Sequence, residues 1–126
     1  MKTPREELAT SWDPTTLDLA LETRFRCAYC EKDFFASVDD YYSLEVEHIV
    51  PISKGGPDSP ENKTVVCSTC NFLKSGWDPR SETGDNASRS AMLEAAKQYV
   101  AQRRTEMEEK VAREKRLAET IMDRRT

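Results

Sequence analysis

The sequence contains little of what several protein classes require. It has one histidine and four glycines in 126 residues, and aromatic residues make up only 8%. No apolar run approaches the roughly 18 residues of a membrane-spanning helix, so the sequence predicts no contact with a membrane. The opening stretch MKTPREELATSWD also lacks the apolar segment of a secretory signal. We therefore expect a cytoplasmic protein.

Charged residues, in contrast, are abundant and unevenly distributed. They make up 33% of the chain against 37% hydrophobic residues, and the mean hydropathy is −0.75. Residues 1–100 carry 11 Lys or Arg against 17 Asp or Glu, whereas residues 101–126 carry 8 against 6. An acidic main body is not typical of a tight non-specific DNA binder, although bound cations would offset part of the charge. The length favours one domain with a small core.

The four cysteines need an explanation, because disulfides are uncommon in the cytoplasm. They form two Cys-x-x-Cys pairs, Cys27/Cys30 and Cys67/Cys70. Each two-residue gap lets one tight turn present two thiolates to a single ion at about 2.3 Å, and two such turns complete a tetrahedron. We predict a closed, structural Zn²⁺ site whose binding contributes folding free energy. The alternatives are two unrelated redox pairs or free buried thiols.

Turn residues and periodicity predict the elements around these pairs. Asp13 as an N-cap, with Pro14 at the first helical position, predicts a helix over 14–23. The stretches LEVEHIV, at 44–50, and KTVVC, at 63–67, have the composition of strands. The Gly- and Pro-rich segment between them is typical of a loop. The second cysteine pair is expected to lead into a short helix.

The C-terminal third has a different character. From Ala87 to Arg125 there is no Gly or Pro and many strong helix formers, which predicts one long helix. Its first half, to about Val100, is expected to pack on the core, and its second half to be solvated or to face a partner. The predicted division is a flexible lead-in over 1–13, a central domain over 14–86 and a long charged helix over 87–126.

The residues between and after the cysteine pairs resemble a known family. The strings CAYC (27–30), EVEHIVPISKGG (45–56), EN (61–62) and CSTCNFLKSG (67–76) look like the HNH endonuclease family. They are especially similar to its zinc-bearing subgroup, in which two Cys-x-x-Cys turns bracket the catalytic hairpin. The resemblance covers about residues 24–77. It implies a small ββα-metal core with a four-cysteine zinc site. With the N-terminal helix and the long C-terminal helix that the residue pattern predicts, the expected fold class is α+β.

The resemblance also implies roles for matching residues. His48 would be the general base that deprotonates a water attacking the phosphorus, although a lone histidine is often only a core or surface residue. Glu47 would bind one catalytic cation, directly or through water, where many members have Asp, or it is a solvated carboxylate. Asn71, where many members have His, would be the second ligand, or else it is a helix N-cap. These oxygen ligands favour Mg²⁺ or Mn²⁺.

Three further polar residues each have two interpretations. Asn62 matches the middle residue of the family motif and would hold the catalytic loop in place, or it is a simple turn residue. Lys74 would either contact a phosphate or be a solvated charge on the short helix. Glu45 is expected to face solvent, the alternative being support of the catalytic cation's ligands.

The predicted function is an HNH endonuclease that nicks double-stranded DNA with one divalent cation and His48 as general base. Two alternatives stay open. One is a catalytically inactive zinc-binding module for DNA or protein interaction, and the other is a nuclease subunit active only within a larger phage or restriction assembly. The C-terminal helix also offers a route to a homodimer or a larger nucleoprotein assembly. Basic residues near the expected site are few: Arg24, Arg26, Lys54, Lys63, Lys74 and Arg80.

Overall fold

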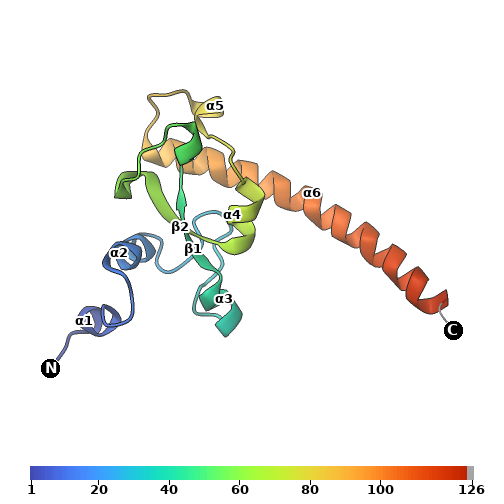
Figure 1. The fold of residues 1–126 in the computed structure, drawn as a ribbon, viewed down its shortest axis with the longest axis horizontal. Coiled ribbons are helices and arrows are strands. Elements are labelled where there is room, and N and C mark those ends of the chain that lie inside the picture. The colour runs from blue at the N-terminus through green and yellow to red at the C-terminus, as the bar shows by residue number, and fades with distance from the viewer. Residues whose placement is uncertain (125–126) are drawn as a thin grey trace.

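A computed structural model describes residues 1–124, and the predicted helix end at Arg125 lies outside them. The chain forms a small α+β domain with a long C-terminal helix, which confirms the expected fold class (Figure 1). In chain order the elements are α1 (Pro4–Leu8), α2 (Pro14–Glu22), α3 (Val38–Tyr42), β1 (Leu44–His48), η1 (Ile52–Lys54), η2 (Pro60–Asn62), β2 (Lys63–Cys67), α4 (Ser68–Lys74), α5 (Arg80–Thr83) and α6 (Arg89–Arg124), where η marks a single 3₁₀ turn.

The two strands form an antiparallel hairpin that is followed directly by α4. Leu44 lies opposite Cys67, and His48 lies opposite Lys63. Because side chains alternate along a strand, Glu45 and Glu47 share one face of β1, and this face meets α4. The pattern LEVEHIV would place its apolar residues inward. The structure instead buries Glu47, at 6% exposure, and exposes Val46, at 38%, because α4 supplies polar partners for the glutamates.

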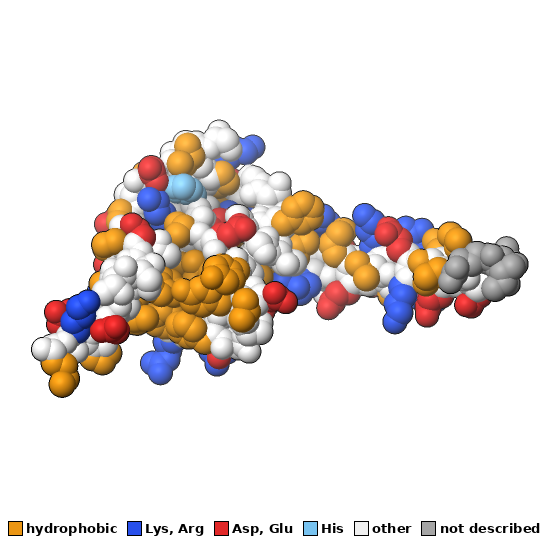
Figure 2. Space-filling view, turned by 60° about the horizontal axis from the view of Figure 1, so that its bottom comes forward, with side chains coloured by type: hydrophobic (Ala, Val, Ile, Leu, Met, Phe, Trp, Pro, Cys, Tyr) orange, Lys and Arg blue, Asp and Glu red, His pale blue; other side chains and the backbone are white. Residues whose placement is uncertain are grey.

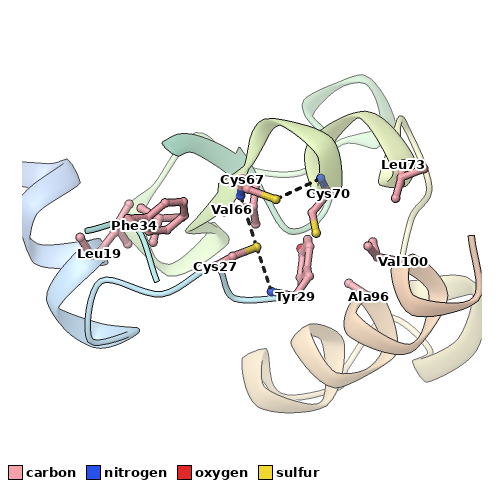
Figure 3. Packing of buried hydrophobic residues seen from close by; sticks show 12 residues of the cluster. Leu19, Cys27, Tyr29, Phe34, Val66, Cys67, Cys70, Leu73, Ala96 and Val100 are labelled. Atoms are coloured by element: carbon pink, nitrogen blue, oxygen red, sulfur yellow. Dashed lines mark hydrogen bonds between the residues drawn. The ribbon is translucent and has the colours of Figure 1, made fainter. Parts of the chain in front are cut away.

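The hydrophobic core lies around the cysteines. Apolar side chains from α2, β2, α4 and the first half of α6 surround them, as Figure 3 shows. Ala96 and Val100 of α6 are fully covered, which agrees with the expected packing of that half of the helix. From Val111 to Asp123 every residue is exposed, and this half of α6 extends away from the domain (Figure 1). The core is therefore small and centred on the two Cys-x-x-Cys turns.

The N-terminal part carries two short helices that the sequence pattern did not predict. Thr3 and Glu6 form a reciprocal capping box at the start of α1, inside the segment expected to be a flexible lead-in. Trp12 then meets Phe25 and Tyr41 edge to face, at ring separations of 5.5 and 6.0 Å. These aromatic contacts join the N-terminal segment to α3, beside an apolar patch visible in Figure 2. Among residues 1–124, no helix has both the length and the hydrophobicity needed to cross a bilayer.

Candidate active site and metal centre

The four cysteines come together in one cluster. The sulfur atoms of Cys27, Cys30, Cys67 and Cys70 all lie within 4.8 Å of one another, and none forms a disulfide. Cys30 Sγ and Cys67 Sγ are 3.8 Å apart. A tetrahedral ion with bonds of about 2.3 Å requires ligand separations of about 3.8 Å, so the spacing fits zinc. The cluster is therefore positioned to bind a metal, as the spacing of the cysteines predicted.

Hydrogen-bond donors surround the sulfur atoms. Cys27 Sγ accepts from the backbone N–H groups of Tyr29 and Cys67, at 3.4 and 3.2 Å (Figure 3). The guanidinium of Arg104 donates to Cys70 Sγ at 3.1 Å. Such donors stabilise thiolates, and the positive charge of Arg104 offsets part of the negative charge of a four-cysteine site. Arg104 was not expected as a partner of the cluster, although a cation at a core-facing position of α6 is a signal that could have found it.

The thiols cannot all ionise by themselves at this spacing. The pKa of Cys27 rises to about 11, first because of its hydrogen bond with Cys67. The pKa of Cys70 is also raised, whereas that of Cys67 is lowered because Cys27 donates a hydrogen bond to its sulfur. One thiolate is thus stabilised at the expense of its neighbours. A divalent cation removes this restriction, because it neutralises the repulsion among thiolates.

The loop between the strands is tied back on itself by Asn62. Its Oδ1 accepts from Val50 N–H, and its Nδ2 donates to the carbonyls of Val50 and Pro57, each at 2.9 Å. Gly55 has a φ of 90° at the end of η1, which a glycine adopts without strain. A Cβ on Gly56 would lie 2.0 Å from the Val50 carbonyl oxygen. Gly55 therefore allows the turn, and Gly56 allows the chain to approach Val50 closely. The hydrogen bonds of Asn62 then hold this arrangement in place.

His48 is at the end of β1, at the mouth of this loop. Its side chain is 27% exposed, and its Nε2 lies 2.9 Å from Asp58 Oδ1. Lys63, on the opposite strand, contacts the same oxygen at 2.9 Å. The hydrogen bond from His48 is the largest cause of a lowered pKa at the Asp58 carboxyl, followed by the bond from Lys63. The single histidine is thus a partly exposed residue in a defined polar contact, and its pale blue side chain is visible at the surface in Figure 2.

Lys74 occupies neither of the two positions expected for it. It is fully buried, so it is not a solvated charge, and the buried ammonium is not presented to a phosphate. Its Nζ donates to Glu47 Oε1 at 2.8 Å, to the Ile49 carbonyl at 2.9 Å and to the His48 carbonyl at 3.3 Å. An ammonium has three protons, so these acceptors use its full capacity. Lys74 therefore fixes the backbone on which His48 is carried.

Glu47 is enclosed by the same network. Its second oxygen, Oε2, accepts from the hydroxyl of Tyr29 at 2.5 Å. Burial raises the pKa of Glu47, and Lys74 opposes that shift. Burial, and then the charge of Glu47, raises the pKa of Tyr29 well above its usual value. With both oxygens paired and 6% exposure, Glu47 is not a solvated carboxylate and is not free to bind a cation directly in this arrangement. Tyr29 lies inside the first Cys-x-x-Cys turn, so the network joins that turn to β1.

Asn71 is inside α4 rather than at its start, so it is not the N-cap, a position that Cys67 occupies. Its Nδ2 donates to Glu45 Oε1 at 2.6 Å, and both residues are half-buried. Glu45 therefore does not simply face solvent, contrary to the expectation from the strand pattern. The carboxylate of Glu45 and the amide oxygen of Asn71 are hard donors of the kind that Mg²⁺ and Mn²⁺ prefer. This accessible pair fits a divalent cation that keeps several water ligands.

Most of the basic residues expected near the site already have protein partners. Arg80 pairs with Asp78 and also donates to the Lys54 carbonyl. Arg26 donates to the Glu31 carbonyl. With Lys63 on Asp58 and Lys74 buried, Arg24 and Lys54 remain as exposed basic side chains of the predicted set, with no side-chain partner within residues 1–124. The surface around His48 is thus weakly basic at most.

Comparison with known families agrees with this architecture. Residues 27–75 match the model of the HNH endonuclease family. A search of curated proteins gave no match. The matched segment begins at the first cysteine and ends immediately after α4, so it contains the whole cysteine cluster, both strands and His48. The sequence resemblance is confirmed over the segment that carries the site, where residues 27–75 are similar to the HNH endonuclease family.

Proposed function

We propose that this domain hydrolyses phosphodiester bonds in double-stranded DNA and nicks one strand at a time. The family implies a nucleic-acid substrate. The observation that supports a catalytic role is the position of His48, a partly exposed imidazole at the end of β1. The Lys74 ammonium donates to the carbonyls of His48 and Ile49. Asn62 accepts from the backbone N–H groups of Ile49 and Val50, so the backbone that follows His48 is held from two sides. Such fixation is what a general base requires.

Each residue then has a distinct part. His48 takes the proton of the attacking water through the ring nitrogen that faces away from Asp58. Asn62 and Lys74 position the strand end and do not touch the substrate. Asn71 and Glu45 would hold a Mg²⁺ or Mn²⁺ ion, which when bound supplies stabilisation of the charge that develops on the phosphate. The four-cysteine cluster would hold a structural Zn²⁺ and take no part in the chemistry.

The ligand assignment has a direct test. Glu45→Gln and Glu47→Gln each remove one carboxylate charge from the same face of β1. Mn²⁺ binding, measured by electron paramagnetic resonance of the free ion, should weaken in Glu45→Gln and remain in Glu47→Gln. If only Glu47→Gln weakens Mn²⁺ binding, Glu47 is the cation ligand that the family resemblance implies, and the ion takes the place of the Lys74 ammonium beside it.

Nicking of supercoiled plasmid with Mg²⁺ or Mn²⁺ tests the proposed activity. His48→Ala should lower the rate by roughly 10²–10⁴-fold, the usual contribution of a general base. Val46→Ala is the matched control, because Val46 is an exposed residue of the same strand. It should nick as the wild type does. Equal nicking by His48→Ala, purified in parallel, would contradict the proposed role.

A second candidate is a domain that acts on DNA only within a larger assembly. It is favoured by the pairing of Arg80, Arg26 and Lys63 with protein groups, which leaves little free positive charge near His48. In that case the isolated chain should fold and bind zinc but bind DNA weakly and nick slowly. A chain that binds zinc and DNA but never nicks with either cation would instead support a non-catalytic interaction module.

A further inference from the structure

The imidazole of His48 contacts a carboxylate that the proposed function leaves without a role. Asp58 lies between η1 and η2, ten residues after His48, and its side chain is 68% exposed. Its Oδ1 nevertheless lies 2.9 Å from His48 Nε2. A contact between an exposed carboxylate and an imidazole contributes little free energy unless the backbone already places the carboxylate there.

Close contacts and hydrogen bonds fix the backbone that leads into Asp58. The Pro57 carbonyl accepts from Asn62 Nδ2 at 2.9 Å. Gly56 N–H donates to the Pro51 carbonyl at 3.0 Å, and Gly56 lies against the Val50 carbonyl. The loop therefore returns Asp58 to the end of β1 without requiring the His48 contact itself. This makes the carboxylate a preorganised partner for the imidazole.

The pairing of the two strands places a positive charge, that of Lys63, beside Asp58. His48 and Lys63 are directly opposite each other, so their side chains lie on the same face of the hairpin. Lys63 Nζ contacts the same Asp58 oxygen at 2.9 Å. The lysine is a counter-charge for the Asp58 carboxylate, and the hydrogen bonds from His48 and then from Lys63 lower the pKa of that carboxyl. An ionised carboxylate is an acceptor only, so the ring nitrogen facing it must carry a proton.

We propose that Asp58 is a positioning residue that holds His48 in the tautomer with the proton on Nε2 and Nδ1 free to accept a proton. Within residues 1–124, no protein group hydrogen-bonds Nδ1, and the His48 side chain is partly exposed. The inference rests on the proposed function for its catalytic consequence. The tautomer itself is a property of the protein alone and can be measured without substrate or catalytic cation.

Because His48 is the only histidine, its ring nitrogens can be assigned without ambiguity in an untagged, ¹⁵N-labelled, zinc-loaded chain. The spectra are recorded at about pH 8, where a model-peptide imidazole is neutral. Long-range ¹H–¹⁵N spectra should then show a protonated Nε2 and an unprotonated Nδ1. In Asp58→Asn, whose amide can either donate or accept, this preference should fall toward a mixture. Asp39→Asn, an exposed position in α3, is the matched control and should keep the wild-type spectrum.

Nicking by the same variants tests the catalytic consequence. Asp58→Asn should be at least about 10-fold slower than the wild type at saturating DNA, with an unchanged KM, because the carboxylate acts on the base and not on the substrate. A wild-type chain with the proton on Nδ1 would overturn the proposal, and so would an Asp58→Asn variant with unchanged tautomer and rate. If the wild type fails to nick at all, the proposed function fails, while the spectra still decide the assignment of Asp58.

Discussion

Replacing Lys74 by methionine tests whether the buried ammonium supports the strand that carries His48. Methionine keeps the length and apolar contacts of the side chain but removes three hydrogen bonds and the charge. The change leaves the Glu47 carboxylate buried with only the Tyr29 hydroxyl as a partner. Breaking a buried ion pair in this way usually costs about 3–5 kcal/mol. For a chain of this size that corresponds to a fall in Tm of roughly 10–20 °C.

The loss should also depend on pH. Burial already raises the pKa of Glu47, and removal of Lys74, which opposes that shift, raises it further. The folded state then holds the Glu47 proton more tightly than the unfolded state does, so unfolding releases a proton. The stability of Lys74→Met should therefore fall, relative to wild type, as the pH rises above about 4.5, the ordinary value for this carboxyl.

Urea unfolding followed by circular dichroism measures both effects. Lys110→Met is the control, since Lys110 is an exposed lysine of α6 and its loss should change stability by less than about 0.5 kcal/mol. Adding Glu47→Gln to Lys74→Met removes the buried carboxylate charge that has lost its lysine partner. The double variant should therefore be more stable than Lys74→Met alone. Equal losses in the two lysine variants, or no recovery in the double variant, would refute the reasoning.

The metal cluster and the loop can be tested in the same way. Metal analysis should find about one zinc per chain, and Cys67→Ser should lower that content and destabilise the fold, whereas the exposed Thr69→Ser should not. Strong chelators should unfold the domain, and a fully folded zinc-free chain would contradict a structural role for the metal. Gly56→Ala should cost about 1–3 kcal/mol in thermal unfolding, because its Cβ would meet the Val50 carbonyl, whereas Gly76→Ala, with open space around it, should be nearly neutral.

Much of the fold around the site follows from local sequence. The Cys-x-x-Cys spacing determines that each pair of sulfurs can face one ion, and the structure brings the two pairs together. The strand pattern places β1 and β2 where they are found, and the N-cap Asp13 begins α2 as expected. These features depend on neighbours within a few residues, where propensity and turn chemistry decide. The five-residue helices α1 and α3 were missed because they are too short to show a helical period.

Only the tertiary structure decided which polar groups meet. Glu45 and Glu47 are equivalent in the sequence pattern, yet one faces Asn71 and stays accessible while the other is buried on Lys74. Their environments differ because α4 packs on β1 and sets a different partner against each carboxylate. Arg104 reaches the cysteine cluster from 34 residues away in the chain, through the packing of α6 on α4. Local sequence thus determined the cysteine pairs, the strands and the place of the histidine, whereas packing between distant elements determined their hydrogen bonds, their charges and their access to solvent.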